Sequence, residues 1–145
     1  MGAQAVLGPT GPAGSLAASW SLARATLRAA EAGAIETPGL VRADDVLTKL
    51  LLFENTSLAD RIATRWLTPL AALTPKARRR MEETALAYMQ QRGNAAAMAR
   101  ALGVHPQTAR YRLRGLRELL GDAIEDPDAR FEIELALRAR LQAPV

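Results

Sequence analysis

The side chains with the clearest chemical potential in this sequence are the arginines of residues 92–117. This segment holds two short stretches with helical spacing, separated by Gly103-Val104-His105-Pro106. In the second stretch, polar and cationic residues fall on the side opposite the apolar positions. Guanidinium groups along one helix face suit contacts to phosphate oxygens and guanine edges. The pattern is typical of a helix-turn-helix, in which the second helix enters the major groove of DNA.

Capping residues predict where both helices begin and end. Asn94 can accept hydrogen bonds from the free N–H groups of the first helix. Gly103 follows the last apolar residue of that helix, where a left-handed backbone is common. His105 and Pro106 suit the N-cap and first positions of the second helix, because proline lacks an N–H that would go unused there.

The second helix has an apolar stripe at Ala109, Leu113 and Leu116, which we expect to face inward. Leu113 is expected to contact the preceding helix, and the later leucines to contact a closing helix near Phe131 and Leu135. The opposite face and the two capping positions then provide the candidate DNA-binding residues. These are Asn94, His105, Gln107, Thr108, Arg110, Tyr111, Arg112 and Arg114.

The charge distribution supports this interpretation. The net charge is only +4, but residues 76–117 contain ten basic residues and two acidic ones, whereas residues 1–75 contain six of each. Such a local positive field is what the neutralisation of phosphates requires. Arg78-Arg79-Arg80 lies in the first turn of a predicted helix, where cations oppose the helix dipole, so a nearby phosphate backbone is one explanation and a solvated face the other.

Two function classes therefore stay open. The first is a DNA-binding transcription regulator. The second is a helical module for protein interaction or dimerisation, whose arginine helix binds an acidic partner. Duplex binding with a steep dependence on salt would distinguish the first from the second.

The segment also resembles the C-terminal helix-turn-helix of the PucR/CdaR family of bacterial transcription regulators over roughly residues 77–140. The matching residues are Arg92-Gly93-Asn94, Ala99, Leu102, Val104-His105, Thr108, Arg110-Tyr111-Arg112-Leu113 and Leu119-Leu120-Gly121, followed by Asp126-Pro127, Arg130-Phe131-Glu132 and Leu135-Ala136-Leu137. The resemblance implies a sequence-specific transcription factor that reads DNA with the helix starting at Pro106. Pro106 and Gly115 depart from the family pattern, and Gly115 lowers helix stability by about 1 kcal/mol relative to alanine.

Upstream, residues 5–10, 19–32 and 39–45 look like the tail of the degenerate GGDEF-like domain that precedes this helix-turn-helix in the family. No Gly-Gly-Asp-Glu-Phe motif occurs, so no residues support cyclase activity. The resemblance implies a C-terminal fragment of such a regulator, without a sensing domain or a small-molecule effector.

The predicted fold is all-α, a winged-helix-like or homeodomain-like helical bundle preceded by a helical segment with at most a short β remnant. Residues 1–14 are expected to be a flexible N-terminus or β remnant, 15–73 the helical tail of the GGDEF-like domain, and 74–145 the DNA-binding domain. The strand-like run Ala5-Val6-Leu7 is expected to lack sheet partners, and Thr37-Pro38-Gly39 to form a turn.

Other chemistry finds little support. The chain has no cysteine and only one histidine, His105, which excludes a thiolate metal site, a multi-histidine metal site and a relay shared between histidines. We therefore expect no enzyme activity, cofactor or metal. The sequence contains no signal peptide and no apolar run of ~18 residues, so we expect a cytoplasmic protein that does not insert into membranes. We also expect a homodimer that forms through the apolar helices at 16–32 and 46–67.

Overall fold

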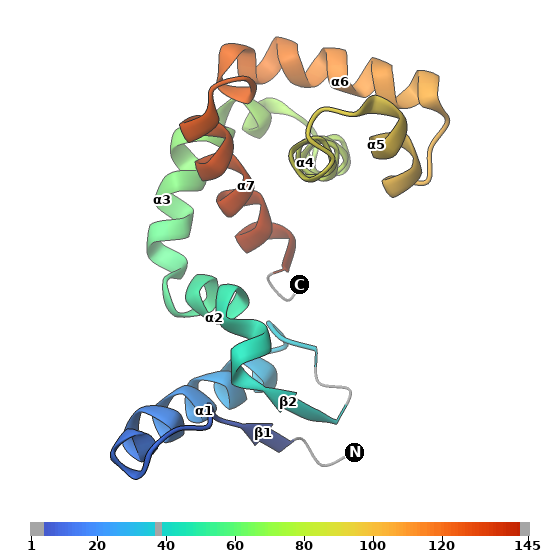
Figure 1. Cartoon of the computed structure of the whole chain (residues 1–145). Helices are drawn as coiled ribbons and strands as arrows, with labels where there is room; N and C mark the ends of the chain where they lie inside the picture. The colour runs from blue at the N-terminus through green and yellow to red at the C-terminus, as the bar shows by residue number, and fades with distance from the viewer. Residues whose placement is uncertain (1–4, 37–38, 143–145) are drawn as a thin grey trace. The chain divides into compact units, whose positions relative to one another are not determined.

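The structure is a computed structural model that describes residues 5–36 and 39–142. The chain divides into two compact units, one formed mainly by residues up to Thr56 and the other by residues 57–141. The described residues form seven α-helices and one two-stranded sheet (Figure 1). The all-α prediction is confirmed. Residues 1–4 of the expected N-terminal segment, and Thr37-Pro38 of the expected turn, lie outside the described residues.

The first unit contains a strand–helix–strand arrangement. Strand β1 (Ala5–Leu7) and strand β2 (Leu40–Arg42) are joined through helix α1 (Leu16–Glu31) and pair in parallel, with Val6 opposite Val41. Helix α2 (Leu47–Glu54) follows β2. The expectation that the first strand lacks a sheet partner is therefore wrong. Its partner is only three residues long, which is too short to show a strand periodicity in the sequence.

A small apolar core holds this first unit together. Ala29, Ile35, Val41 and Leu50 are buried together, and they come from α1, the loop that follows it, β2 and α2. The charged ends of the helices are also linked, because Arg28 Nη2 donates to Glu54 Oε1 at 2.9 Å.

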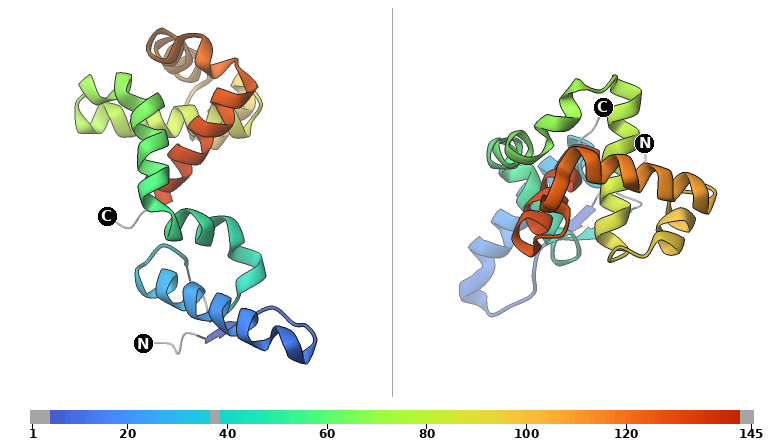
Figure 2. Two further views of the ribbon diagram at one scale, coloured as in Figure 1. Left: turned by 90° about the vertical axis from the view of Figure 1, so that its left-hand side faces the viewer. Right: turned by 90° about the horizontal axis from the view of Figure 1, so that it is seen from above.

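The second unit is entirely helical over residues 57–141, all of which the structure describes. It contains α3 (Thr56–Leu67), α4 (Pro75–Gln90), α5 (Ala95–Ala101), α6 (Pro106–Leu120) and α7 (Pro127–Gln142). Figures 1 and 2 show α4, α5 and α6 as three consecutive helices joined by short loops. No strand accompanies them in this range, so the helix-turn-helix carries no β wing.

The ends of these helices follow from local residue chemistry. Thr74 Oγ1 accepts from Ala77 N–H and Pro75 occupies the first turn of α4. Asp126 Oδ1 accepts from Ala129 N–H at 2.8 Å at the start of α7. Both are N-cap arrangements that satisfy otherwise free N–H groups.

The core of the second unit is built from every helix in it. Leu67 is the last residue of α3 and Leu70 follows it in the chain. Met98 lies on α5 and Leu116 on α6, and all four side chains have almost no exposed surface. Ile133 and Leu137 of α7 complete the cluster. The inward positions predicted for α6 are confirmed, because Ala109, Leu113, Leu116 and Leu120 are all buried.

One core prediction is wrong. Phe131 is 69% exposed, although we expected the leucines of α6 to meet it. The buried positions of α7 are Ala129, Ile133, Ala136 and Leu137, which share one face at helical spacing. Phe131 lies two residues before Ile133, a rotation of about 200° at 3.6 residues per turn, so it points away from that face.

Among the residues that the structure describes, no helix has both the length and the apolar character needed to cross a lipid bilayer.

Candidate nucleic acid interface

The turn between α5 and α6 is tight and built around a glycine. Gly103 has a φ of 62°, in the left-handed region that glycine adopts without strain. The Val104 N–H then donates to the Ala99 carbonyl at 3.0 Å, which closes the end of α5. Small buried residues, Ala99 on α5 and Ala109 on α6, let the two helices approach closely. The result is the helix-turn-helix that the spacing predicted.

Two candidate residues are occupied with capping. Asn94 Oδ1 accepts from the N–H groups of Ala96 and Ala97 at 3.1 and 3.0 Å, which fixes the start of α5. His105 Nδ1 accepts from the Gln107 N–H at 3.2 Å, which fixes the start of α6. Both residues are exposed, and each cap uses only one polar atom of the side chain, Asn94 Oδ1 or His105 Nδ1.

The outer face of α6 carries the other candidates. Gln107, Thr108, Arg110 and Arg114 are exposed, and Tyr111 is 76% exposed, which is high for an aromatic side chain. Arg112 is partly buried and lines a groove between α4 and α6. The structure thus places these six residues along one helix, with all but Arg112 exposed.

The basic residues differ in what they already bind. Arg79 pairs with Glu83 at 2.9 Å, and Arg117 pairs with Glu125 at 3.4 Å. In contrast, within the described part of the chain, no ion pair involves Arg110, Arg112 or Arg114. The charge of α6 is therefore concentrated on side chains that are available to an external anion.

The three consecutive arginines Arg78, Arg79 and Arg80 have different surroundings. The Arg78 guanidinium turns back and donates to the Ala71 carbonyl at 2.8 Å, so it holds the turn before α4. Arg79 is paired along its own helix. Arg80 lines a groove between α4 and α6. Sequence reasoning treated the three arginines alike, because their different orientations depend on where α4 packs.

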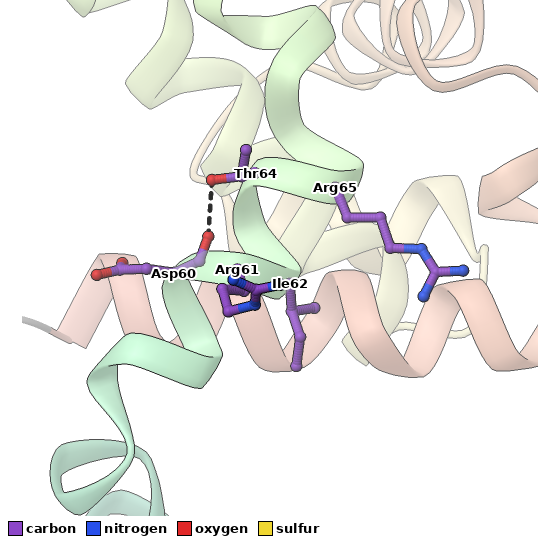
Figure 3. Close-up of a pocket in the computed structure, with 5 residues that line it drawn as sticks. All are labelled: Asp60, Arg61, Ile62, Thr64 and Arg65. Atoms are coloured by element: carbon purple, nitrogen blue, oxygen red, sulfur yellow. Dashed lines mark hydrogen bonds between the residues drawn. The ribbon is translucent and has the colours of Figure 1, made fainter.

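Two other hollows lack a convergent set of polar groups. One is a shallow surface on α3 lined by Asp60, Arg61, Ile62, Thr64 and Arg65, and Figure 3 shows these side chains pointing in different directions from one stretch of helix. The hydrogen bond in it runs within the helix, from Thr64 Oγ1 to the Asp60 carbonyl at 2.8 Å. The other is an apolar groove of about 510 Å³ between α1 and α2.

Metal-binding chemistry has no assembled site in the described ranges 5–36 and 39–142, where no group of three or more His, Asp or Glu side chains could hold an ion.

Comparison with known families agrees with the geometry. Residues 81–139 match the family model of the PucR C-terminal helix-turn-helix domain. The match runs from the second turn of α4 to residue 139 in the last turn of α7, so it includes the whole helix-turn-helix and most of its closing helix. This part of the chain is therefore similar in sequence to a PucR-type helix-turn-helix domain.

The search of curated proteins gave no match to this chain. The family match does not reach residues 5–45, so their relation to a GGDEF-like domain stays a prediction.

Proposed function

We propose that this chain is a sequence-specific transcription regulator that reads the major groove of DNA with α6, starting at Pro106. The observation that carries the proposal is the division of α6 into two faces. One face is buried at Ala109, Leu113 and Leu116, and the other presents exposed arginines that form no ion pair within the described residues. A helix so anchored offers its cationic face to DNA without rearrangement.

The outer face of α6 has residues suited to base contacts. Arg110 and Arg114 lie one turn apart, about 6 Å along the helix axis, and each can donate two hydrogen bonds to a guanine. Gln107 can pair with an adenine edge, and Thr108 can contact a base or a phosphate. Tyr111 adds an exposed ring and a hydroxyl between them.

The remaining candidates position the domain on the duplex. The Asn94 amide and the His105 ring lie at the N-termini of α5 and α6, where the helix dipole also favours phosphate. Such contacts fix orientation and carry no base preference of their own.

We further propose that the chain acts as a homodimer through its N-terminal helices. One helix-turn-helix contacts few base pairs, so selectivity is usually gained by two-fold dimers on half-sites ~34 Å apart. Exposed apolar residues on α1 and α2 support this, namely Leu16, Trp20, Leu47 and Leu51. Large exposed apolar side chains on the same two helices are the kind of surface at which proteins associate.

The test of dimerisation is sedimentation of the chain at micromolar concentration, with and without DNA. Leu51→Lys should dissociate the dimer, whereas the matched control Phe131→Lys, which adds the same charge at an exposed apolar residue of α7, should not. A monomer under both conditions would exclude the dimer and leave DNA binding untouched.

The test of DNA reading begins with a selection on random duplexes. Mobility shifts on the selected duplex and on a scrambled one then compare Arg110→Ala and Arg114→Ala with Arg61→Ala. Arg61 is a matched control because it is an exposed arginine on α3, well apart in sequence from α6 (Figure 3). A bidentate contact to guanine should be worth ~1–3 kcal/mol and concern one base pair.

Two results would refute this reading mode. Unchanged affinity in both α6 variants would show that the outer face of α6 does not contact DNA. Retention of an acidic protein, without any duplex binding, would favour the protein-interaction module instead.

A further inference from the structure

A groove of about 380 Å³ runs between α4 and α6, beside the outer face of α6. Its floor is apolar and its rim is polar. Leu73, Ala77, Met81 and Gly115 form the floor. The rim consists of Arg80 from α4 and Thr108, Tyr111, Arg112, Arg114 and Glu118 from α6.

The two helices each contribute an arginine that is not otherwise engaged. Within residues 57–141, no ion pair or hydrogen bond involves the guanidinium of Arg80 or of Arg112, although those of the neighbouring Arg78 and Arg79 both have partners. Arg80 belongs to α4 and Arg112 to α6, so the two side chains line the same groove only because these helices pack together. A site assembled from two helices is more specific than a row of arginines along one.

We propose that this groove binds the phosphate backbone of the DNA strand that borders the major groove read by α6. The inference rests on the proposed function and deepens it. Arg80 and Arg112 each present a planar guanidinium that can donate two hydrogen bonds to one phosphate. The Thr108 hydroxyl is a third donor at the same rim.

DNA suits the groove better than an acidic peptide does, because the groove and the reading face share residues. Thr108, Tyr111 and Arg114 belong to both. A duplex seated on α6 must therefore place a backbone strand at the mouth of the groove. A peptide would have no such reason to lie there.

The apolar floor and the single acidic residue define where the phosphates lie. Leu73 and Met81 give the groove an apolar lining beside the arginines, and an apolar surrounding strengthens the attraction between an arginine and an anion. Glu118 would repel a phosphate, so the strand lies toward Arg112 and Thr108, about two to three turns closer to the start of α6.

The test compares Arg80→Ala with Arg79→Ala in the full chain. These neighbours remove the same charge from the same helix, but only Arg80 lines the groove. Duplex affinity is measured between low and high salt on the selected and the scrambled sequence. Arg80→Ala should weaken both complexes equally and reduce the salt slope by about one, as expected for one lost phosphate contact. Arg79→Ala should leave the slope unchanged.

Ethylation interference adds a positional readout. Ethylation of certain phosphates should block binding of the wild-type protein. One or two of these phosphates, at the edge of the site, should have no effect on binding of the Arg80→Ala variant when they are ethylated. Arg112→Lys should weaken binding less than Arg112→Ala, because lysine keeps the charge and loses the two-pronged donor.

Each contrary outcome has one meaning. If the wild-type chain binds no duplex, the proposed function and the groove assignment both fail. If it binds duplex with the same affinity and salt slope after Arg80→Ala, only the groove assignment fails. If a polyglutamate or phosphopeptide probe loses affinity for Arg80→Ala while duplex binding is unchanged, the groove serves an acidic protein and the assignment to DNA is wrong.

Discussion

The Tyr88 hydroxyl donates a hydrogen bond to Glu125 Oε1 at 3.0 Å, which joins α4 to the loop that follows α6. The same carboxylate oxygen accepts from Arg117 Nη2 at 3.4 Å. The Arg130 guanidinium, in the first turn of α7, lies 5.8 Å from the centre of the Tyr88 ring. These contacts link the C-terminal end of α6 to α4 and α7. The Arg117 guanidinium is held by Glu125 and is therefore not free to bind DNA in the way proposed for Arg110 and Arg114.

Tyr88→Phe tests this link. The ring stays in the core while the hydroxyl is lost, so the free energy of unfolding should fall by about 0.5–1.5 kcal/mol, the usual contribution of one hydrogen bond. Urea denaturation followed by circular dichroism measures the change. An unchanged midpoint would show that water replaces Tyr88 at Glu125 without cost.

Leu113→Ala tests the orientation of α6. Leu113 is buried beside α4, so its truncation should cost ~2–5 kcal/mol of unfolding free energy. Phe131→Ala is the matched control, because that larger side chain is exposed and should cost less than about 0.5 kcal/mol. Equal losses at the two positions in denaturant melts would contradict the packing described above.

Two glycines of the helix-turn-helix should respond in opposite directions to alanine. A Cβ at Gly115 would meet only Met81 Cε, at 3.5 Å, which is ordinary contact. Gly115→Ala should therefore raise the unfolding free energy by about 0.5–1 kcal/mol through better helix propensity. Thermal melts of this variant should show a higher Tm.

At Gly103 the expected change is a loss. No atom lies near its Cβ position, but its φ of 62° costs an alanine about 1–2 kcal/mol. Finding Gly103→Ala as stable as the wild type would mean that the turn relaxes to another conformation.

Arg110→Lys and Arg114→Lys separate charge from hydrogen-bond geometry. Each keeps one positive charge, so the salt slope of duplex binding should stay the same. The two-pronged contact to guanine is lost, so discrimination against a substituted base pair should fall by ~1–3 kcal/mol. Titrations on a panel of single-base variants measure it, and full discrimination in both lysine variants would argue that these arginines contact phosphates only.

Local chemistry made the helix-turn-helix predictable. Asn94, Gly103 and His105 each act through neighbours within a few residues, and each has the cap or turn role that the sequence predicted. The inward stripe of α6 was equally readable, because its leucines recur at helical spacing.

What depends on packing between distant segments could not be predicted. Phe131 is apolar but lies on the wrong side of its helix. The pairing of β1 with β2 joins residues more than thirty positions apart through three-residue strands, which leave no pattern. The groove between α4 and α6 exists only once both helices are in place, and so the sequence did not distinguish Arg80 from Arg79.

The basic surface around the helix-turn-helix is made almost wholly of arginine, and Lys76 is the one lysine between residues 57 and 141. Arginine stays protonated throughout the pH range in which proteins fold. Lysine acetylation, which removes charge from many DNA-binding surfaces, has a single target here, outside α5 and α6. Control of DNA binding through lysine acetylation therefore has little to act on in this unit. The same composition gives a practical handle, because an amine-reactive dye within this unit attaches at Lys76 and leaves α6 unmodified.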